Sequence, residues 1–303
     1  MNSISICIPT YKRPDGLKKL LLSIKDCDID KTLINTLYII IVDNDKERSA
    51  FELVSDLAEN ELNAFDLSYF HYPMQGLAKV RNELLKRAFE RNTDYIAFID
   101  DDEFADPVWL NQLVTTIVHN DADLVMGPVQ PVFEKEIPDS IAKWLYRKDH
   151  NNNQRLHFIR SGNLIINASR LRSFNIWFNP HFDKMGGEDS YFGKKMAQKG
   201  ALIHWAANAV AYETTPETRT KLVWLLKRKY RGAFMFTYIL KMEKEYLKLF
   251  KKVCFSFIYL IIGILSAPLI LIPFRNRYWG IMKINEALGS YASLFNMTYV
   301  AYK

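Results

Sequence analysis

Three aspartates follow a short apolar segment without a break, because Tyr95–Ile99 leads directly into Asp100, Asp101 and Asp102. An apolar run of this length is typical of a strand buried in a parallel sheet, and such sheets bind ligands beyond the carboxyl ends of their strands. Since adjacent carboxylates repel one another, we expect a cation to neutralise them. Their oxygen atoms suit Mg²⁺ or Mn²⁺, and Mg²⁺ commonly bridges to the phosphates of a substrate. A solvated acidic turn is the alternative interpretation.

A second acidic pair, Glu188 and Asp189, follows the glycines Gly186 and Gly187. Paired glycines permit unusual backbone angles and the close approach of another molecule. We expect the two carboxylates at a helix start, where one could act as a general base toward an acceptor hydroxyl and the other could bind acceptor hydroxyls. The alternative is an acidic helix N-terminus that the helix dipole stabilises.

The segments that must position these acids alternate between strand and helix. Apolar runs predict strands, and apolar residues spaced three and four apart predict helices. The expected strands span residues 4–8, 37–42, 67–70, 95–99 and 160–166, and the expected helices span 16–25 and 77–91. This order predicts an α/β fold, a three-layer α/β/α sandwich with a mostly parallel central sheet. The sequence lacks the glycine-rich motifs of a dinucleotide-binding Rossmann site and of a P-loop.

Two further residues stand where a nucleotide could bind. Asp43 ends the second expected strand and could accept hydrogen bonds from a nucleotide base, although an Asx turn or a helix cap is the interpretation that this residue alone favours. Arg81 lies near a helix start, where a phosphate or a uracil carbonyl could also interact with the helix dipole. A surface arginine is the alternative there.

In their order along the chain, these motifs resemble the family-2 glycosyltransferases of the GT-A fold. The resemblance rests on Pro-Thr-Tyr at residues 9–11, Asp43, the helix start GLAKVRN and FIDDDE, with GGED further on. It implies that the acidic triplet is the family's DxD motif, formed by Asp100 and Asp102 with Asp101 between them. It also implies a UDP-sugar donor.

The resemblance implies roles for individual residues. Asp102 would bind the metal directly, Asp100 would lie near the ribose and the metal, Asp189 would be the catalytic base and Glu188 would bind the acceptor. Many relatives complete the metal site with a histidine after the next strand. This sequence has Glu213 there, which resembles the subgroup of succinoglycan-type glucosyltransferases, and a carboxylate is a credible ligand for Mg²⁺ or Mn²⁺. The residues expected to hold the nucleotide sugar are Pro9, Thr10, Tyr11, Arg13, Asp43, Arg81, Asp100 and Asp101.

Composition indicates a globular chain with an ample core, because 49% of its 303 residues are hydrophobic and 24% are charged. Its three cysteines, Cys7, Cys27 and Cys254, are scattered, so neither a disulfide framework nor a zinc site is expected. The first residues enter a strand pattern without the features of a signal peptide. We therefore expect the main domain to be cytosolic.

Positive charge is concentrated toward the C-terminus. Residues 217–252 contain 11 Lys or Arg and 3 Asp or Glu, a balance of +8 within a total of +6, and residues 253–274 then carry no charged side chain. A basic segment beside an apolar run of this length favours membrane association, and no nucleic-acid-binding motif accompanies it. Pro268 and Pro273 leave open a straight span, a kinked re-entrant helix or an interfacial helix. Residues 278–299 are too amphipathic to span and are expected beside the run or in the interface.

Arg228 and Arg231 lie three residues apart in this basic segment and therefore share a helix face. Their guanidinium groups could bind the departing diphosphate of a donor, or they could contact anionic lipid headgroups. We expect these residues to contribute to the nucleotide-sugar site, and the lipid contact stays open.

We expect a GT-A catalytic domain over residues 1–215, with a nucleotide-binding half at 1–103 and an acceptor half at 104–215, followed by membrane-associating helices at 216–303. The expected activity is metal-dependent, inverting transfer from a UDP-sugar to a hydroxyl of a cell-surface glycan or lipid-linked oligosaccharide, at the cytoplasmic face of the inner membrane. Two alternatives stay open. One is transfer to a polyprenyl phosphate, an anionic acceptor that needs no base, and the other is a non-catalytic, nucleotide-binding membrane adaptor.

Overall fold

The structure is a computed structural model that describes residues 1–146, 149–160 and 162–297. The chain divides into two compact units. The first unit contains residues 1–132, 147–183 and 188–214, and the second contains residues 133–146, 184–187 and 215–303.

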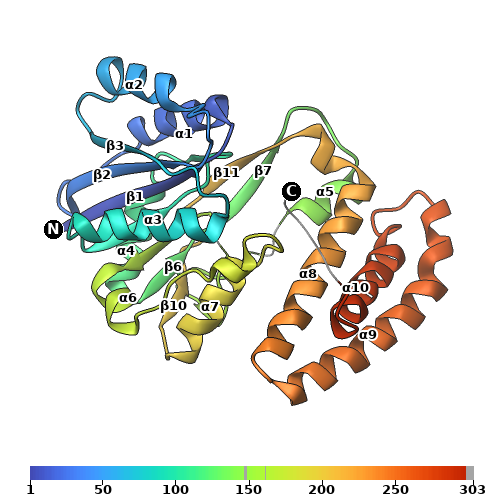
Figure 1. The fold of residues 1–303 in the computed structure, drawn as a ribbon. Coiled ribbons are helices and arrows are strands. Elements are labelled where there is room, and N and C mark those ends of the chain that lie inside the picture. Colours follow the sequence, from blue (N-terminus) through green and yellow to red (C-terminus); the bar gives the residue numbers. More distant parts are fainter. Residues whose placement is uncertain (147–148, 161, 298–303) are drawn as a thin grey trace. The chain divides into compact units, whose positions relative to one another are not determined.

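The first unit is built on an eight-stranded sheet with the order β3-β2-β1-β4-β9-β6-β10-β8 (Figure 1). Its strands are β1 (Asn2–Thr10), β2 (Ile34–Asp43), β3 (Asp66–His71), β4 (Tyr95–Phe98), β6 (Leu124–Met126), β8 (Arg155–Leu156), β9 (Leu164–Asn167) and β10 (Ile203–Trp205). All of them run in one direction except β8 and β9, which run in the opposite direction. The prediction of a mostly parallel sheet is confirmed.

The strands form where the apolar runs predicted them, with one exception. The expected strand at 160–166 begins only at Leu164, and it runs antiparallel to β4. Gly162 has a φ of +102°, which interrupts an extended backbone and so delays the strand.

Helices cover both faces of this sheet. On one face lie α1 (Pro14–Lys25), α2 (Phe51–Asn60) and α4 (Trp109–His119), and on the other lie α3 (Leu77–Glu90), α6 (Ala168–Phe174) and α7 (Glu188–Gln198). Side chains of β1 alternate between the two cores: Ile6 and Ile8 pack with the first set, and Cys7 packs with the second. This period of two is that of a strand buried on both faces, and it confirms the three-layer sandwich.

A smaller sheet has the order β5-β11-β7 and contains β5 (Glu103–Ala105), β11 (Ala211–Thr215) and β7 (Val129–Phe133). β5 follows the acidic triplet directly. It pairs antiparallel with β11, so that Glu103 lies opposite Glu213. The smaller sheet therefore brings Glu213 beside the loop that carries the three aspartates.

The second unit is helical. Its elements are α5 (Asp139–Leu145), the short 3₁₀ helix η2 (Glu217–Thr220), α8 (Leu222–Met242), α9 (Tyr246–Ser266), the 3₁₀ turn η3 (Ala267–Leu271) and α10 (Trp279–Leu294). Another 3₁₀ helix, η1 (Pro180–Phe182), belongs to the first unit. A Cβ atom on Gly280 of α10 would lie 2.8 Å from the carbonyl oxygen of Gly263 in α9. Of the two arrangements expected for residues 278–299, packing beside the apolar run is therefore observed for α10, and residues 298 and 299 lie outside the described range.

Within the described part of the chain, one segment is long and apolar enough to cross a membrane, judged by length and composition alone. It spans Tyr246–Leu271; its most apolar stretch of 18 residues has a mean hydropathy of 2.4, and only 11% of that stretch is buried. A soluble protein's core helix can pass the same test, but such a helix would be mostly buried.

Candidate active site

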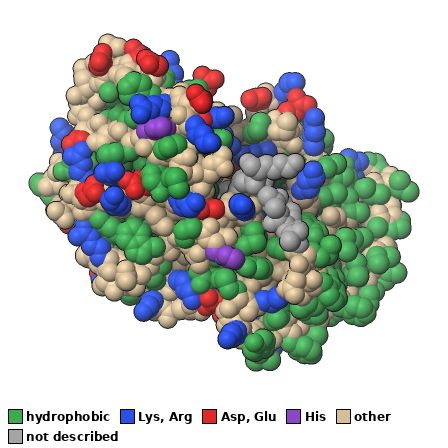
Figure 2. Space-filling model, in the orientation of Figure 1, with side chains coloured by type: hydrophobic (Ala, Val, Ile, Leu, Met, Phe, Trp, Pro, Cys, Tyr) green, Lys and Arg blue, Asp and Glu red, His purple; other side chains and the backbone are tan. Residues whose placement is uncertain are grey.

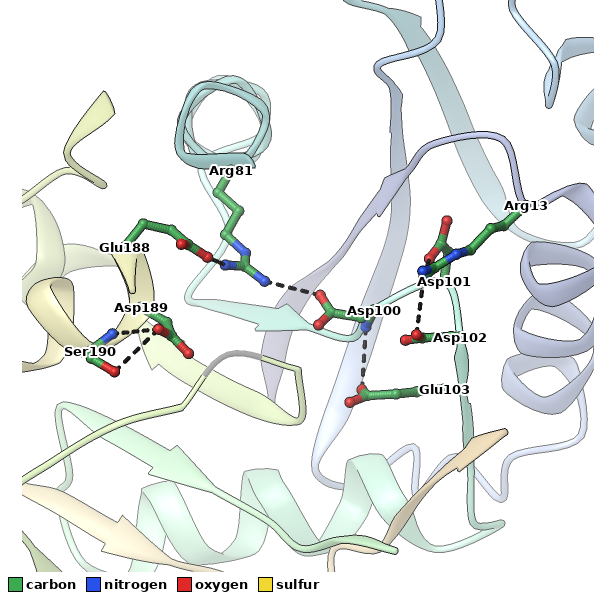
Figure 3. A network of polar contacts seen from close by, with 9 residues as sticks. All are labelled: Arg13, Arg81, Asp100, Asp101, Asp102, Glu103, Glu188, Asp189 and Ser190. Atoms are coloured by element: carbon green, nitrogen blue, oxygen red, sulfur yellow. Dashed lines mark hydrogen bonds and ion pairs between the residues drawn. The ribbon is translucent and has the colours of Figure 1, made fainter. Parts of the chain in front are cut away.

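The three aspartates after β4 differ in their partners (Figure 3), and the middle one, Asp101, accepts hydrogen bonds from the loop after β1. Thr10 Oγ1 and the Tyr11 backbone N–H donate to Asp101 Oδ2 at 3.0 and 3.2 Å, and Arg13 Nη1 donates to Oδ1 at 3.0 Å. Asp101 is 6% exposed, and this burial raises its pKa to about 6 even though the Arg13 charge opposes the rise. Asp101 therefore ties the loop after β1 to the loop after β4.

Arg13 also contacts Asp102, the third acid. The same Nη1 atom donates to Asp102 Oδ2 at 2.9 Å. The Arg13 side chain is 47% exposed and that of Asp102 is 21% exposed, so water reaches this ion pair. Burial lowers the pKa of Arg13, but the charges of Asp101 and Asp102 outweigh burial and the net shift is upward. Asp102 is thus the more open of the two acids that Arg13 holds.

Asp43 ends β2 opposite Thr10 of β1 and is fully buried. Its Oδ1 accepts from the Asp45 N–H at 2.8 Å, and its Oδ2 accepts from the Ala50 N–H at 3.1 Å and the Tyr69 hydroxyl at 2.8 Å. The hydrogen bond from Asp45 to Asp43 forms an Asx turn, which is the interpretation that Asp43 favours when it is considered by itself. Ala50 is the residue at the start of α2. Oδ2 uses both of its lone pairs on the Ala50 and Tyr69 donors, whereas Oδ1 has one further lone pair, so nucleotide binding by Asp43 stays a prediction.

Arg81 is a buried residue of α3, with 1% of its surface exposed, and the surface interpretation is wrong. Its Nη1 donates to Glu188 Oε1 at 2.6 Å, and its Nη2 donates to Asp100 Oδ1 at 3.2 Å (Figure 3). Its Nε makes no hydrogen bond with any described residue. Burial lowers the pKa of this guanidinium, but the surrounding carboxylates outweigh burial and raise it. A single buried cation therefore joins one acid of each motif.

The glycine pair and the two acids after it adopt the predicted geometry. Gly186 and Gly187 have φ angles of +79° and +89°, and α7 begins at Glu188. Glu188 is 5% exposed, and burial raises its pKa to about 7, with Arg81 opposing the rise and Asp189 adding to it. Asp189 is only partly buried, and its Oδ1 accepts from the backbone N–H and the hydroxyl of Ser190 at 2.6 and 3.3 Å.

Asp183 is a residue of this region that the sequence did not single out. Its Oδ1 accepts from the Ala78 N–H in the first turn of α3 at 2.8 Å, across 105 residues of sequence. Gly76, with a φ of +127°, precedes the helix, and a Cβ atom there would lie 2.2 Å from the Asp183 carboxyl group. A carboxylate of this chain thus occupies the helix start where a phosphate was considered. The sequence signal that could have indicated such a partner is Gly76 at the N-cap of α3, because glycine has no side-chain oxygen to accept from the first N–H groups of the helix.

Comparison with known proteins identifies the family. The profile of glycosyl transferase family 2 matches residues 5–175, more than half of the chain. The chain belongs to glycosyl transferase family 2. It is 31% identical over 235 residues to the succinoglycan biosynthesis protein ExoM of Rhizobium meliloti (strain 1021), across 76% of this chain and 72% of that protein. It is 25% identical over 250 residues to a chondroitin synthase of Escherichia coli, across 71% of this chain but only 35% of that protein.

Solved structures show the same fold for this glycosyltransferase. The mannosyltransferase PcManGT of Pyrobaculum calidifontis, in complex with GDP-Man and Mn²⁺, has a TM-score of 0.67 at 14% identity and matches 98% of this chain and 88% of that one. Residues 1–349 of Staphylococcus aureus TarS, in complex with UDP-GlcNAc, have a TM-score of 0.56 at 16% identity and match 98% and 93%. The GT-A fold is therefore shown for this member of glycosyl transferase family 2.

The predicted metal ligands of this glycosyltransferase, Asp100, Asp102 and Glu213, offer only carboxylate oxygens, the chemistry that Mg²⁺ and Mn²⁺ prefer. Among residues 1–146, 149–160 and 162–297, no three His, Cys, Asp or Glu side chains converge as a ready metal site. A further acid, Glu103, is 3% exposed and accepts from the Asp100 N–H at 3.3 Å. A Cβ atom at Gly162 would lie 2.4 Å from its Oε1, so glycine leaves room for this carboxylate. The carboxylate oxygens of these residues are therefore the type of ligand that Mg²⁺ and Mn²⁺ prefer.

Arg228 and Arg231 belong to α8, in the second unit, whereas the acids belong to the first. The Arg228 guanidinium lies 5.2 Å from the centre of the Trp224 ring in the same helix. A role for either arginine toward the leaving diphosphate stays a prediction.

Proposed function

We propose that this chain is an inverting glycosyltransferase that moves a sugar from a UDP-sugar to a hydroxyl of a cell-surface glycan or lipid-linked oligosaccharide. The observation that carries the proposal is the buried Arg81, which contacts Asp100 of the acidic triplet and Glu188 of the acidic pair. The predicted donor-side and acceptor-side acids therefore meet on one side chain. The name of the Rhizobium meliloti relative, a succinoglycan biosynthesis protein, supports a polysaccharide acceptor.

On the acceptor side, Asp189 acts as the general base. It removes the proton from the acceptor hydroxyl as the oxygen attacks the anomeric carbon, and the diphosphate leaves from the opposite face of the sugar. Asp189 suits this role because it is the more open acid of the pair. Glu188 binds acceptor hydroxyls through Oε2, because its Oε1 is held by Arg81.

On the donor side, the ends of β1, β2 and β4 supply the nucleotide-sugar site. The proposed residues are Pro9, Thr10, Tyr11, Arg13, Asp43, Arg81, Asp100 and Asp101, with Arg228 and Arg231 helping to neutralise the leaving diphosphate. Asp102, Asp100 and Glu213 would hold Mg²⁺ or Mn²⁺, which when bound supplies positive charge to the diphosphate. The Mn²⁺ in the Pyrobaculum calidifontis complex supports a metal in this fold.

We place the enzyme at the cytoplasmic face of the inner membrane. Two observations support this location. The basic segment at 217–252 directly precedes the apolar segment, and that segment is the one described helix that meets the length and hydropathy of a membrane span.

The experiment that tests the proposal measures UDP release by the full-length protein across a panel of UDP-sugars, with and without acceptor lipid, in Mg²⁺, Mn²⁺ or excess chelator. We expect acceptor-stimulated release that requires the metal. Asp102→Asn should abolish release while leaving the fold intact, because it removes a carboxylate from a repulsive cluster. The matched control is Asp56→Asn, an exposed aspartate of α2, which should release UDP at the wild-type rate.

Three outcomes would overturn parts of the proposal. Equal turnover in excess chelator by wild type and Asp102→Asn would exclude the metal site. Full activity of Asp189→Asn toward a polyprenyl phosphate would favour the anionic acceptor, which needs no base. UDP binding without turnover of any donor would favour a nucleotide-binding adaptor.

A further inference from the structure

The second unit exposes a continuous apolar surface along α9 and the η3 turn, which we call the α9 face. Six of its members are Phe250, Phe257, Ile261, Leu265, Leu271 and Ile272. The first four are spaced so that they share one side of the helix. Leu265 and Leu271 are 76% and 85% exposed, far more than a soluble core helix would allow. Figure 2 shows this surface as a broad area of apolar side chains over the C-terminal helices.

The opposite side of α9 is covered by α10. Ser256 and Gly263 are buried there, and a Cβ atom on Gly263 would lie 2.9 Å from the Gly280 carbonyl oxygen. On its other side α10 packs equally closely on α8, because a Cβ atom on Gly289 would lie 2.2 Å from the Tyr230 carbonyl oxygen. These close backbone contacts place α8, α10 and α9 side by side in a three-helix layer, with α9 at its edge. One side of α9 packs on α10, and the α9 face lies on the opposite side.

The contact between α9 and α10 includes a charged cluster. Glu286 of α10 pairs with Lys252 of α9 at 3.3 Å and with Lys283 at 2.9 Å, and the Lys283 ammonium lies 4.0 Å from the centre of the Tyr259 ring. Tyr259 is the seventh residue of the uncharged run 253–274, so an α9 that crossed a bilayer would carry Lys283 about two helical turns into the hydrocarbon, with Glu286 at its edge beside Lys252. Charged side chains at that depth are costly.

Helix length also opposes a crossing. At about 1.5 Å per residue, the 16 residues of α10 span roughly 24 Å, less than the ~30 Å of bilayer hydrocarbon. Since α10 runs antiparallel along α9, with Lys252 near Glu286 and Gly263 near Gly280, the two helices would have to cross together.

We infer that α9 and η3 lie in the plane of one membrane leaflet, with the α9 face in the acyl-chain region, and do not cross the bilayer. Exposed lysines, Lys244, Lys248 and Lys251, stand at one end of the α9 face, and Arg275 stands just beyond the other. Basic residues around an apolar helix face suit anionic phospholipid headgroups. This inference rests on the proposed membrane location and selects the interfacial arrangement from the three that the sequence left open.

Thiol labelling tests the topology. In a full-length Cys254→Ser background, Lys248→Cys and Arg275→Cys place one thiol near each end of the α9 face. In right-side-out and inside-out vesicles, a membrane-impermeant maleimide should label both positions only from the cytoplasmic side. Labelling of the two positions from opposite sides would overturn the inference while leaving membrane association intact.

A binding measurement separates this inference from the proposed location. Leu265→Glu places a charge on the α9 face and should weaken binding of the purified full-length protein to phosphatidylglycerol-containing vesicles by at least ~10-fold. Release of UDP with a soluble acceptor analogue should not change. The matched control is Val118→Glu on α4, where the valine is 48% exposed, and it should bind vesicles as wild type does. If Leu265→Glu bound vesicles as tightly as the wild type, the α9 face would not be the membrane-binding surface. If the wild-type protein did not bind vesicles, the proposed membrane location would be wrong as well.

Discussion

The two acidic motifs of the catalytic unit assign different tasks to neighbouring carboxylates. In the triplet, Asp101 is buried and bound by the loop after β1, whereas Asp102 is more open. In the pair, Glu188 is buried against an arginine, whereas Asp189 is only partly buried at the helix start. In each motif one acid is buried among protein partners, and its neighbour is more open to water.

The motifs differ in the arginine that holds them. The side chain of Arg13, which bridges Asp101 and Asp102, is 47% exposed, whereas that of Arg81, which bridges Asp100 and Glu188, is 1% exposed. Water screens the first set of ion pairs, so another cation can replace Arg13 at modest cost. In the second set the Arg81–Glu188 pair is dry, with side chains 1% and 6% exposed, so removing Arg81 leaves the buried Glu188 without compensation. The Arg13 contacts of the triplet are therefore the exchangeable ones, and the pair, held through Glu188, is the rigid motif.

The largest expected effect separates the two acids of the rigid motif. Asp189→Asn should lower kcat by about 10²–10⁴-fold, the usual contribution of a general base, without weakening UDP binding. Steady-state kinetics and calorimetric titration with UDP measure both quantities. The comparison variant is Glu188→Gln. If the catalytic loss appeared in Glu188→Gln and not in Asp189→Asn, the roles within the pair would be reversed.

The next prediction compares the two arginines. Arg81→Met should lower the free energy of unfolding by about 3–5 kcal/mol, because it leaves Glu188 buried without its cation. Arg13→Met should cost less, about 1 kcal/mol, because the Arg13 side chain is 47% exposed and the buried Asp101 keeps its hydrogen bonds from Thr10 and Tyr11. Urea unfolding followed by tryptophan fluorescence measures both. Equal losses would show that burial does not distinguish the motifs.

The Arg81→Met deficit should also depend on pH. Burial places the pKa of Glu188 at about 7, so the carboxyl group can take up a proton at lower pH and shed its uncompensated charge. Arg81 opposes this rise, so its removal places the pKa of Glu188 in the variant above about 7. We expect the loss of unfolding free energy to shrink as pH falls toward 7 and to level off below it, and a deficit that stayed constant above pH 7 would contradict the explanation.

A smaller effect concerns Asp101 and the pH dependence of stability. Its folded pKa of about 6 lies above the ordinary value of 3.8, so its contribution to stability is fully present below pH 3.8 and is lost as pH rises through 6. The shift corresponds to roughly 3 kcal/mol. Asp101→Asn, measured in chelator against the Asp56→Asn control, should flatten the pH dependence of unfolding free energy between those values. An unchanged slope would show that Asp101 does not cause it.

The sequence predicted the frame of the site well. The runs at 4–8, 37–42, 67–70 and 95–99 became β1 to β4, because a continuous apolar segment is stable only where both faces of a strand are covered. The acids after Tyr95–Ile99 correctly predicted the end of β4, and the glycines before Glu188 correctly predicted unusual backbone angles followed by a helix start. These features depend on residues close together in the chain, so periodicity and glycine content suffice to find them.

The tertiary structure decided which polar side chains meet. Helical spacing places Arg81 on the same face as Leu77 and Leu84, but no local pattern reveals its two partners, because they lie 19 and 107 residues away in the chain. Asp183 caps α3 across a similar separation, and the charged residues of α10 argue against a crossing only once α10 is seen to pack along α9. Sequence pattern determined where strands and helices form, since that depends on near neighbours. Burial and ion pairing depend on distant segments that the folded chain brings together, and so only the structure could assign them.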